Sequence, residues 1–190
     1  MLLSIDDGCA SDLRVVELCQ KYEVEAIFYW PIEWRSLAYE KGYKPLSYKQ
    51  ACYIARHFEI GAHSITHRWL TSLPFEEAAQ EIMESKTMLE RLFRTKVTKF
   101  CPPRGYTNEG LTSYTNLIYN SQRLTRGEGL VHIHPNSGAN NNMHWLDYVE
   151  HIGLDNVQEG WLHSWELDKY PQEWDNLEKF LRRVYEQAGD

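Results

Sequence analysis

The chain alternates short apolar segments with longer amphipathic ones, and this alternation constrains its fold more than any other feature. Four apolar runs have the length and composition of buried strands, and they are Met1–Ile5, Val24–Trp30, Glu59–Ala62 and Val97–Phe100. Apolar residues recur at helical spacing after the first run, over about Asp12–Tyr22. Repeated strand–helix units place parallel strands in one sheet or barrel. The pattern therefore predicts an α/β fold.

The rest of the chain continues the same alternation. Its 190 residues correspond to a single domain, 1–190, because a typical domain has about 150 residues and neither a repeat nor a linker divides the sequence. Ser11, Ser47 and Asn108 are placed to cap helices. Further elements are expected as helices over 72–93 and 172–187 and as strands over Ile118–Leu124, Leu130–His134 and Gly160–Ser164.

The charge balance and the lack of long apolar runs exclude several classes of protein. The chain has 20 Lys and Arg against 27 Asp and Glu, a net charge of −7, which argues against nucleic acid as a partner. No apolar run approaches the roughly 20 residues of a membrane helix, so we expect no membrane span. Asp6 and Asp7 fall where a signal peptide would be apolar, and the four cysteines form no CxxC pair. Both features favour a cytoplasmic protein with reduced thiols.

Polar side chains that can do chemistry follow the expected strands. Asp6 and Asp7 end the first strand, His63 ends the strand 59–62, and His163 lies in a late one. The segment Cys101–Gly105 follows the strand over 97–100. In parallel α/β folds, functional residues gather at the carboxyl ends of the strands. We therefore expect these residues to meet at one edge of the sheet.

His63 and His67 form the clearest candidate metal site. Two histidines four residues apart lie on the same side of a helical turn, where both can reach one ion. Asp7 would complete a set of two histidines and one carboxylate. Asp6 and Asp7 repel one another unless a cation offsets them, and Asp6 would then be free to act as a base. The alternatives are two surface histidines and an ordinary Asp-Gly turn.

These motifs resemble those of the polysaccharide deacetylases, the carbohydrate esterases with a NodB-homology domain. Leu3–Gly8 is similar to their first motif, usually Thr-Phe-Asp-Asp-Gly, and His63–His67 to the second, His-(Ser/Thr)-x-x-His. Phe100–Gly105 resembles the third, usually Phe-Arg-Pro-Pro-Tyr-Gly, and Leu162-His163 resembles the fifth. The motifs occur in the family's order and extend over nearly the whole chain.

The resemblance implies a distorted (β/α) barrel of about seven parallel strands and one divalent metal ion. Zinc is the expected ion, with Co, Mn, Ni or Fe as alternatives, held by Asp7, His63 and His67. Asp6 would be the general base that deprotonates the attacking water, and His163 the general acid that protonates the leaving amine. A third-motif backbone N–H would help to stabilise the oxyanion.

Two departures from the family pattern concern the third motif. Cys101 stands where the family has an arginine that pairs with the base, and Arg104 stands at the usual tyrosine position. We hypothesise that Arg104 or Arg123 supplies the missing cation. Arg104 could instead bind an anionic group of the substrate, such as a carboxylate or phosphate, and either arginine could be a plain surface residue.

Other assignments are more open. The fourth motif, which orients the catalytic histidine, has no clear counterpart, and Glu166 or Asp168 is a candidate for its role. Expected substrate contacts are Pro103, Arg104, Tyr106, Trp161 and Trp165. The two tryptophans flank His163 and form either a wall for stacking sugars or part of the core. His132 and His134 share a strand face, as half-buried polar residues or near the substrate.

The sequence favours a metal-dependent hydrolase that removes an N-acetyl or related acyl group from an amino sugar or saccharide. One alternative is a hydrolase of a non-sugar amide or cyclic ureide. Another is a catalytically inactive carbohydrate-binding domain on the same barrel, which the exchange at Cys101 would suit. The sequence leaves the exact substrate and the oligomeric state open.

Overall fold

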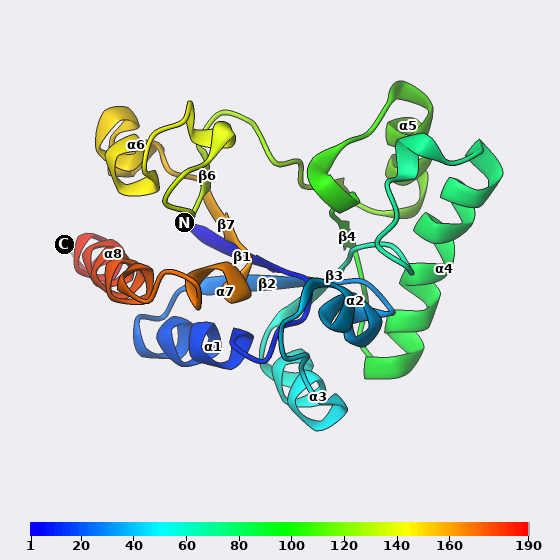
Figure 1. The fold of residues 1–190 in the computed structure, drawn as a ribbon, viewed down its shortest axis with the longest axis horizontal. Coiled ribbons are helices and arrows are strands. Elements are labelled where there is room, and N and C mark those ends of the chain that lie inside the picture. Colours follow the sequence, from blue (N-terminus) through cyan, green and yellow to red (C-terminus); the bar gives the residue numbers. More distant parts are fainter. Residues whose placement is uncertain (190) are drawn as a thin grey trace.

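Seven parallel strands form one sheet in the computed structural model, which describes residues 1–189. Their order across the sheet is β5-β4-β3-β2-β1-β7-β6, and every neighbouring pair is parallel. The sheet curls into a half-barrel with helices around its outside (Figure 1). The strands are β1 (Leu2–Asp6), β2 (Glu25–Trp30), β3 (Glu59–Ala62), β4 (Lys99–Phe100), β5 (Ser121–Gln122), β6 (Leu130–His132) and β7 (Glu159–Leu162).

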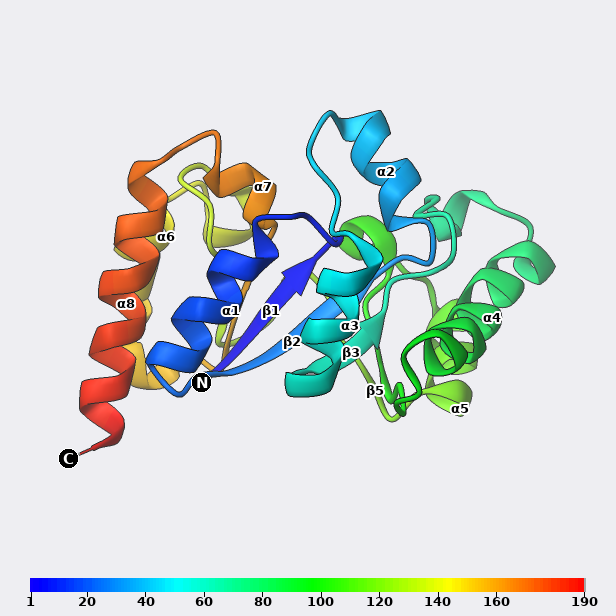
Figure 2. The ribbon, with the colours of Figure 1, turned by 90° about the horizontal axis from the view of Figure 1, so that it is seen from below.

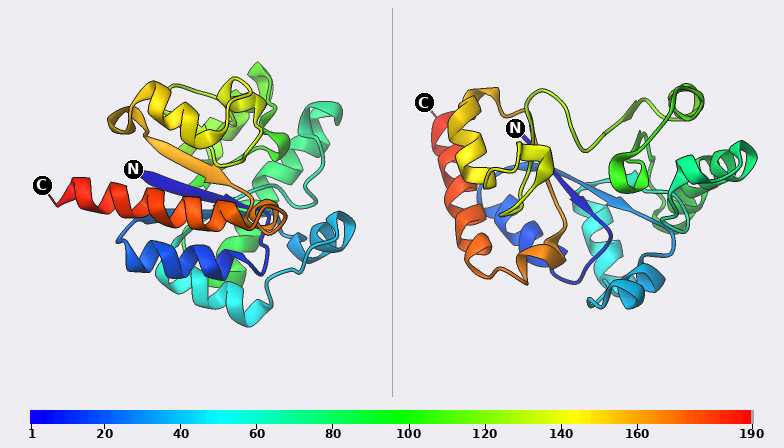
Figure 3. Two further views of the ribbon diagram at one scale, coloured as in Figure 1. Left: turned by 60° about the vertical axis from the view of Figure 1, so that its left-hand side comes forward. Right: turned by 45° about the horizontal axis from the view of Figure 1, so that its top comes forward.

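Helices surround the convex side of the sheet and stand at the end where the strands point. In Figure 2, α2 and α7 lie at the end toward which the β1 arrow points, and Figure 3 shows α1 and α8 side by side along the outer face. Over residues 1–189, no helix is both long and apolar enough to cross a membrane. The helices are α1 (Asp12–Lys21), α2 (Trp34–Lys41), α3 (Tyr48–His57), α4 (Phe75–Phe93), α5 (Glu109–Ile118), α6 (Trp145–Ile152), α7 (Ser164–Leu167) and α8 (Gln172–Ala188).

The predicted fold of about seven parallel strands is confirmed, with one opening. The edge strands β5 and β6 are not paired with each other in the described part of the chain, so the barrel is not closed. The segment 123–129 crosses this opening (Figure 1). Strands β4 and β5 have only two residues each, and Pro102 and Pro103 stop the former because proline cannot donate to a ladder. The short strands leave room for the crossing segment.

The alternation of side chains along the strands decides which residues face the barrel interior. On β1, Leu3 and Ile5 join the large core beneath the helices, so Asp6 points to the opposite, inner side. On β2, Ile27 and Tyr29 pack on that inner side together with Cys101. The interior is thus small and partly polar, whereas the apolar core lies between the sheet and the helices.

Two of the three predicted helix caps are formed. Ser47 accepts from the backbone of Gln50 in a capping box, and Asn108 accepts from Leu111 N–H. The Ser11 side chain caps nothing, because its hydroxyl donates to Asp168 instead.

Three helices, α2, α6 and α7, were not predicted, and three of the later predicted strands are too long. Helices α2 and α6 lacked clear start signals; α2 is fixed by packing of Trp34 on Trp30 and Phe93 and ends at left-handed Gly42. The predicted strand Ile118–Leu124 is wrong at both ends, because Ile118 still belongs to α5 and β5 is only Ser121–Gln122. The predicted strands Leu130–His134 and Gly160–Ser164 run too far, because β6 ends at His132 and β7 at Leu162, and Ser164 already begins α7.

The packing of β3 on β2 predicts a destabilising effect of Gly61→Ala. A Cβ at position 61 would lie 2.3 Å from ring atoms of Tyr29, and such overpacking costs about 1–3 kcal/mol. Urea unfolding should show a lower midpoint for this variant. The matched control is Gly110→Ala, where the nearest atom is at 3.5 Å. Equal midpoints for Gly61→Ala and wild type would contradict the prediction.

Candidate active site

The predicted site residues come together at the carboxyl edge of the sheet. Asp6 and Asp7 end β1, His63 follows β3, Cys101 follows β4 and His163 follows β7. All belong to neighbouring parallel strands, so their ends meet beneath α2 and α7 (Figure 2). The parallel strand order thus brings these residues together, as predicted.

A left-handed backbone at Asp7 separates the two adjacent carboxylates. Asp7 has φ 80° and Gly8 has φ 73°, a conformation that a non-glycine residue adopts only at a cost of about 1–3 kcal/mol. Asp7 N–H donates to the Tyr29 carbonyl at 3.1 Å, and the Tyr43 hydroxyl donates to the Asp7 carbonyl at 3.2 Å. The Asp6 side chain continues into the barrel, while that of Asp7 turns toward the two histidines.

His63 and His67 face one another from a loop. Their ring centroids are 4.9 Å apart, as expected, but the predicted helical turn is wrong. Ser64 and His67 both have positive φ, and Ser64 Oγ accepts from His67 N–H at 3.0 Å. Nδ1 of His63 bonds the Cys101 carbonyl at 2.6 Å, which leaves Nε2 to face Asp7.

Glu81 on α4 fixes the shape of this loop. Its carboxylate accepts from the backbone N–H groups of Ile65 and Thr66, at 2.8 and 2.9 Å, and from the Thr66 hydroxyl at 2.6 Å. Burial alone would raise the pKa of Glu81, but these bonds lower it. Glu81 was not predicted as a site residue. Its signal was an acidic residue among the buried positions of a helix, beside Ala78 and Ile82.

Asp7, His63 and His67 fit a metal ion. Oδ1 of Asp7 lies 3.3 Å from Nε2 of His67 and 3.7 Å from Nε2 of His63. This buried oxygen accepts no hydrogen bond from any described residue, whereas Oδ2 is held by Lys41 Nζ at 2.8 Å and by the Trp165 indole N–H at 3.4 Å. An unpartnered carboxylate oxygen beside two imidazole nitrogens is the donor set that a divalent transition metal takes.

The charges around Asp7 keep it ionised. Burial by itself would raise the pKa of this carboxyl group, but His163, His67 and Lys41 hold it well below the usual range. Burial lowers the pKa of His63 to about 4, so its imidazole is neutral near pH 7. An ionised carboxylate and a neutral imidazole are the protonation states that metal binding requires. Lys41 was not predicted, since it lies on the unpredicted helix α2.

A second group of ligand atoms, in Asp6, His63 and Cys101, does not suit a metal. These atoms lie within 4.8 Å of one another. However, burial raises the pKa of the Cys101 thiol well above its usual value, and only the thiolate is a good ligand. Both oxygens of Asp6 are already bonded to Arg123.

Arg123 is the cation beside Asp6. Nη2 of Arg123 donates to both oxygens of Asp6, to Oδ2 at 2.5 Å, and both side chains are almost fully buried. Arg104, the other candidate for this role, is exposed, and its guanidinium lies 5.9 Å from the centroid of the Trp69 ring. The hypothesis that Arg104 pairs with the base is therefore corrected: that cation comes from residue 123.

His163 lies between Asp7 and Glu166. Its Nδ1 is 2.9 Å from Glu166 Oε2, and its Nε2 is 3.7 Å from Asp7 Oδ2. Burial alone would lower the pKa of His163, but the charges of Asp7 and Glu166 outweigh it and raise the pKa to about 9. Of the two residues considered for orienting His163, the structure places Glu166 there. Asp168 instead accepts from the Trp174 indole at 3.1 Å.

His132 is the third residue of this network. Its Nε2 lies 3.5 Å from the same Glu166 oxygen, and burial lowers the pKa of His132 to about 4. Its ring is stacked on Trp161 with centroids 3.6 Å apart. His134 follows on the chain and lies against Tyr170 rather than in the network.

The expected substrate contacts occupy different environments. Trp161 is 5% exposed and its ring packs on His132, so core packing describes it better than an open sugar-stacking wall. Trp165 is stacked on Tyr43 with centroids 5.5 Å apart. Pro103 is buried, while Tyr106 is 58% exposed and lies 5.5 Å from the Trp69 ring. Trp69, which is also exposed, was not predicted to contact the substrate.

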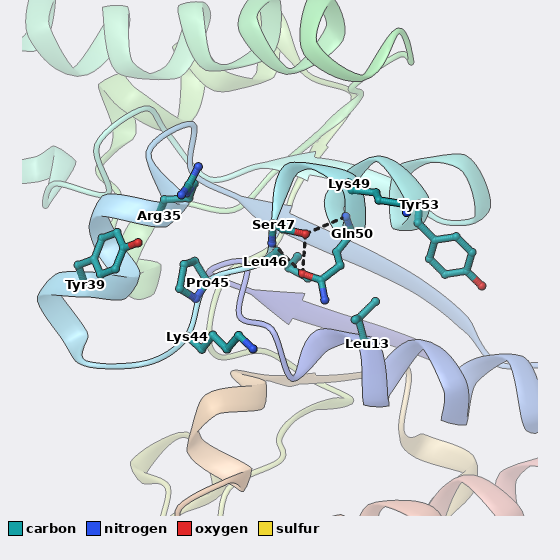
Figure 4. A pocket seen from close by; sticks show the side chains of 10 residues that line it. All are labelled: Leu13, Arg35, Tyr39, Lys44, Pro45, Leu46, Ser47, Lys49, Gln50 and Tyr53. Atoms are coloured by element: carbon teal, nitrogen blue, oxygen red, sulfur yellow. Dashed lines mark hydrogen bonds between the residues drawn. The ribbon is translucent and has the colours of Figure 1, made fainter.

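Two cavities differ in their relation to this site. One of about 360 Å³ includes Trp161, His132 and Arg104 in its lining and therefore adjoins the catalytic candidates. A larger one, of about 770 Å³, lies between α1, α2 and α3 and is lined by residues such as Leu13, Arg35 and Tyr53 (Figure 4). The larger cavity is lined by no histidine, whereas the smaller one is lined by His132, which lies beside the same Glu166 oxygen as His163.

The half-barrel of seven parallel strands, with carboxylates and histidines at its carboxyl edge, matches the NodB-type fold. A sequence profile described as polysaccharide deacetylase matches residues 1–119, and the chain belongs to this family. No curated protein matches the sequence.

Solved structures of carbohydrate esterase family 4 share the fold. A peptidoglycan deacetylase, PdaC, from Bacillus subtilis has a TM-score of 0.67 at 20% identity, over 98% of this chain and 84% of that one. A family 4 esterase from Streptomyces lividans, in complex with acetate, has a TM-score of 0.67 at 16% identity, over 99% and 86%. A family 4 pseudoenzyme from Bacillus anthracis has a TM-score of 0.69 at 17% identity, over 98% of this chain but only 61% of that one.

The His163–Glu166 contact predicts how this histidine titrates in the metal-free protein. NMR should show a pKa of His163 near 9, assigned by the loss of its signal in His163→Gln. Glu166→Gln should lower this pKa because one of the charges that raise it is removed. A folded-state pKa above 6.5 also means that His163 stabilises the metal-free fold fully below pH 6.5, and that this contribution is lost as pH rises through 9. A pKa of His163 below 7 would contradict the prediction.

The buried pair of Asp6 and Arg123 predicts a coupled effect on stability. Arg123→Met should lower the free energy of unfolding by about 3–5 kcal/mol, because it leaves a buried carboxylate unpaired. Asp6→Asn combined with Arg123→Met should recover part of this loss, since neither member of the buried pair is then charged. Urea unfolding of the two single variants and the double variant measures the coupling. Additive losses would show that the two side chains do not interact.

Proposed function

We propose that this protein is a metal-dependent hydrolase that removes an N-acetyl group from an amino sugar or saccharide. The observation that carries the proposal is that two adjacent carboxylates have different partners. Asp7 turns an unpartnered buried oxygen toward His63 and His67, whereas Asp6 is bonded to Arg123. Such a separation serves hydrolysis, because one carboxylate can hold a cation while the other acts as a base.

In this proposal Asp7, His63 and His67 hold the ion. Zinc fits two imidazoles and one carboxylate best, and Co, Mn, Ni or Fe are also compatible with that donor set. A bound divalent cation would supply Lewis acidity toward the amide carbonyl. Lys41 and Trp165 occupy the second oxygen of Asp7, so they hold the free oxygen toward the histidines.

The chain's own residues move the protons. Asp6 accepts the proton of the attacking water, and the hydrogen bonds from Arg123 to both of its oxygens fix the direction of that carboxylate. His163 is paired with the Glu166 carboxylate, which favours the protonated imidazole, so it can donate a proton to the leaving amine. Glu166 orients the imidazole through Nδ1. The C–N bond breaks, the acyl carbon keeps the hydroxyl of water and leaves as acetic acid, which ionises to acetate, and the amine takes the proton of His163. The proton held by Asp6 then replaces the one that His163 has lost.

The saccharide substrate is inferred from the family. The structural relatives include a peptidoglycan deacetylase and a family 4 carbohydrate esterase, and the exposed rings of Trp69 and Tyr106 offer flat surfaces for sugars. A non-sugar amide would fit the same chemistry with a different cavity lining.

The second candidate function is a sugar-binding domain without turnover. The exchange at Cys101 favours it, as does the likeness to a family 4 pseudoenzyme. Against it, Asp6 retains a buried arginine and His163 retains a carboxylate partner, and binding alone requires neither pair.

The metal site predicts separable effects of two sets of substitutions. Wild-type protein should carry close to one transition-metal ion per chain and release acetate from N-acetylglucosamine oligomers. The His63→Ala/His67→Ala variant should lose the metal, because it retains only one ligand. Asp6→Asn should keep the metal but lose at least about a hundredfold in kcat, since general base catalysis contributes roughly 10²–10⁴.

Elemental analysis and acetate release measure the two effects on the same samples. Arg56→Gln, an exposed change on α3, is the control and should alter neither. Wild-type protein that binds no metal even after reconstitution would refute the proposal. Bound metal with no turnover of any N-acetylated saccharide or amide would favour the sugar-binding function.

A further inference from the structure

The cavity beside the catalytic candidates is lined by two arginines and by no acidic side chain. It lies between the turn Pro103–Gly105, the segment that leads to β6, and the turn Gly138–Asn140. Arg104 and Arg126 come from the first two of these segments. Neither forms an ion pair with a carboxylate among residues 1–189. Two unpaired guanidinium groups in one cavity are notable in a chain whose net charge is −7.

Close packing brings the two arginine-bearing segments together. A Cβ on Gly105 would lie 2.3 Å from two atoms of the Thr125 side chain, so the backbone of residue 105 is pressed against the residue that precedes Arg126. Gly105 has φ 71°, which favours glycine for a second reason. Arg104 itself has φ 62°, a left-handed backbone conformation that costs a non-glycine residue about 1–3 kcal/mol. The fold therefore fixes where both arginines leave the backbone.

The cavity also adjoins the reacting residues. Trp161 and His132 belong to its lining. The Trp161 ring centroid is 5.8 Å from that of His163 and 5.1 Å from the guanidinium carbon of Arg123. A substituent seated in the cavity would thus belong to the same sugar as the amide at His163, or to the next one.

We propose that this cavity binds an anionic substituent of the substrate, a carboxylate or a phosphate, between Arg104 and Arg126. Guanidinium groups bind both anions through paired N–H donors. The proposal rests on the hydrolase function and adds a substrate class to it, the acidic N-acetylated saccharides. Trp69, whose ring lies beneath Arg104, would contact the sugar that carries the charge.

The test compares three small probes that differ in charge. N-acetylglucosamine is neutral, N-acetylmuramic acid carries a carboxylate, and N-acetylglucosamine 6-phosphate carries a phosphate. Binding to the zinc-loaded protein is measured by calorimetry, and kcat/KM by acetate release. At least one acidic probe should bind about tenfold or more tightly than the neutral one, and the better of the two identifies the anion.

Variants attribute this preference to the arginines. Arg104→Gln/Arg126→Gln should remove the acidic-over-neutral ratio in both binding and kcat/KM, mainly through KM. Lysine at both positions should restore part of the ratio, because the charge returns without the paired donors. Arg56→Gln removes one exposed charge outside the cavity and should leave the ratio unchanged.

The outcomes separate this proposal from the hydrolase function. A ratio near one in wild type, or a ratio that survives in the double glutamine variant, overturns the anionic site even if acetate is released. Arginine-dependent binding of an acidic probe without any turnover supports the site and refutes the hydrolase.

Discussion

Two adjacent carboxylates buried at the end of β1 impose the main constraint on this structure. Asp6 and Asp7 are at most 2% exposed, and a buried charge without a partner costs several kcal/mol. The fold meets this constraint in two ways. The left-handed backbone at Asp7 points the two carboxylates in different directions. Each forms an ion pair with a different cation, Asp6 with Arg123 and Asp7 with Lys41. The remaining oxygen of Asp7 is the one that faces the histidines.

This constraint explains the position of the segment that follows β5. Arg123 reaches Asp6 because β5 is only two residues long and the chain then crosses the open side of the barrel. The backbone N–H of Arg123 still donates to the Phe100 carbonyl at 2.9 Å, so Arg123 directly follows the last paired residue of β5. The guanidinium group of Arg123 therefore reaches Asp6 in the barrel interior from the open side between β5 and β6.

The same physics decides what the sequence could and could not predict. Asp7, His63 and His67 could be grouped because parallel strands end at one edge of a sheet, whatever the loops do. The helical turn at the histidines was wrong because Glu81 captures the N–H groups of Ile65 and Thr66, and a distant side chain leaves no local signal. Lys41 could not be assigned for the same reason, since only tertiary packing places α2 over the site.

At position 101 a cysteine replaces the family's arginine, but a different arginine, Arg123, lies beside the same carboxylate of Asp6. The Sγ atom of Cys101 lies 4.0 Å from Asp6 Oδ2, so the side chain of residue 101 still faces this carboxylate. Burial keeps its thiol protonated, and a neutral thiol cannot balance a buried carboxylate. Arg123 enters from the crossing segment and bonds both oxygens of Asp6. The family's third motif is thus altered in sequence, while a cation remains beside the carboxylate. A domain that only bound sugars would more easily lose that buried charge altogether, because replacing buried ion pairs by apolar residues is often neutral or stabilising.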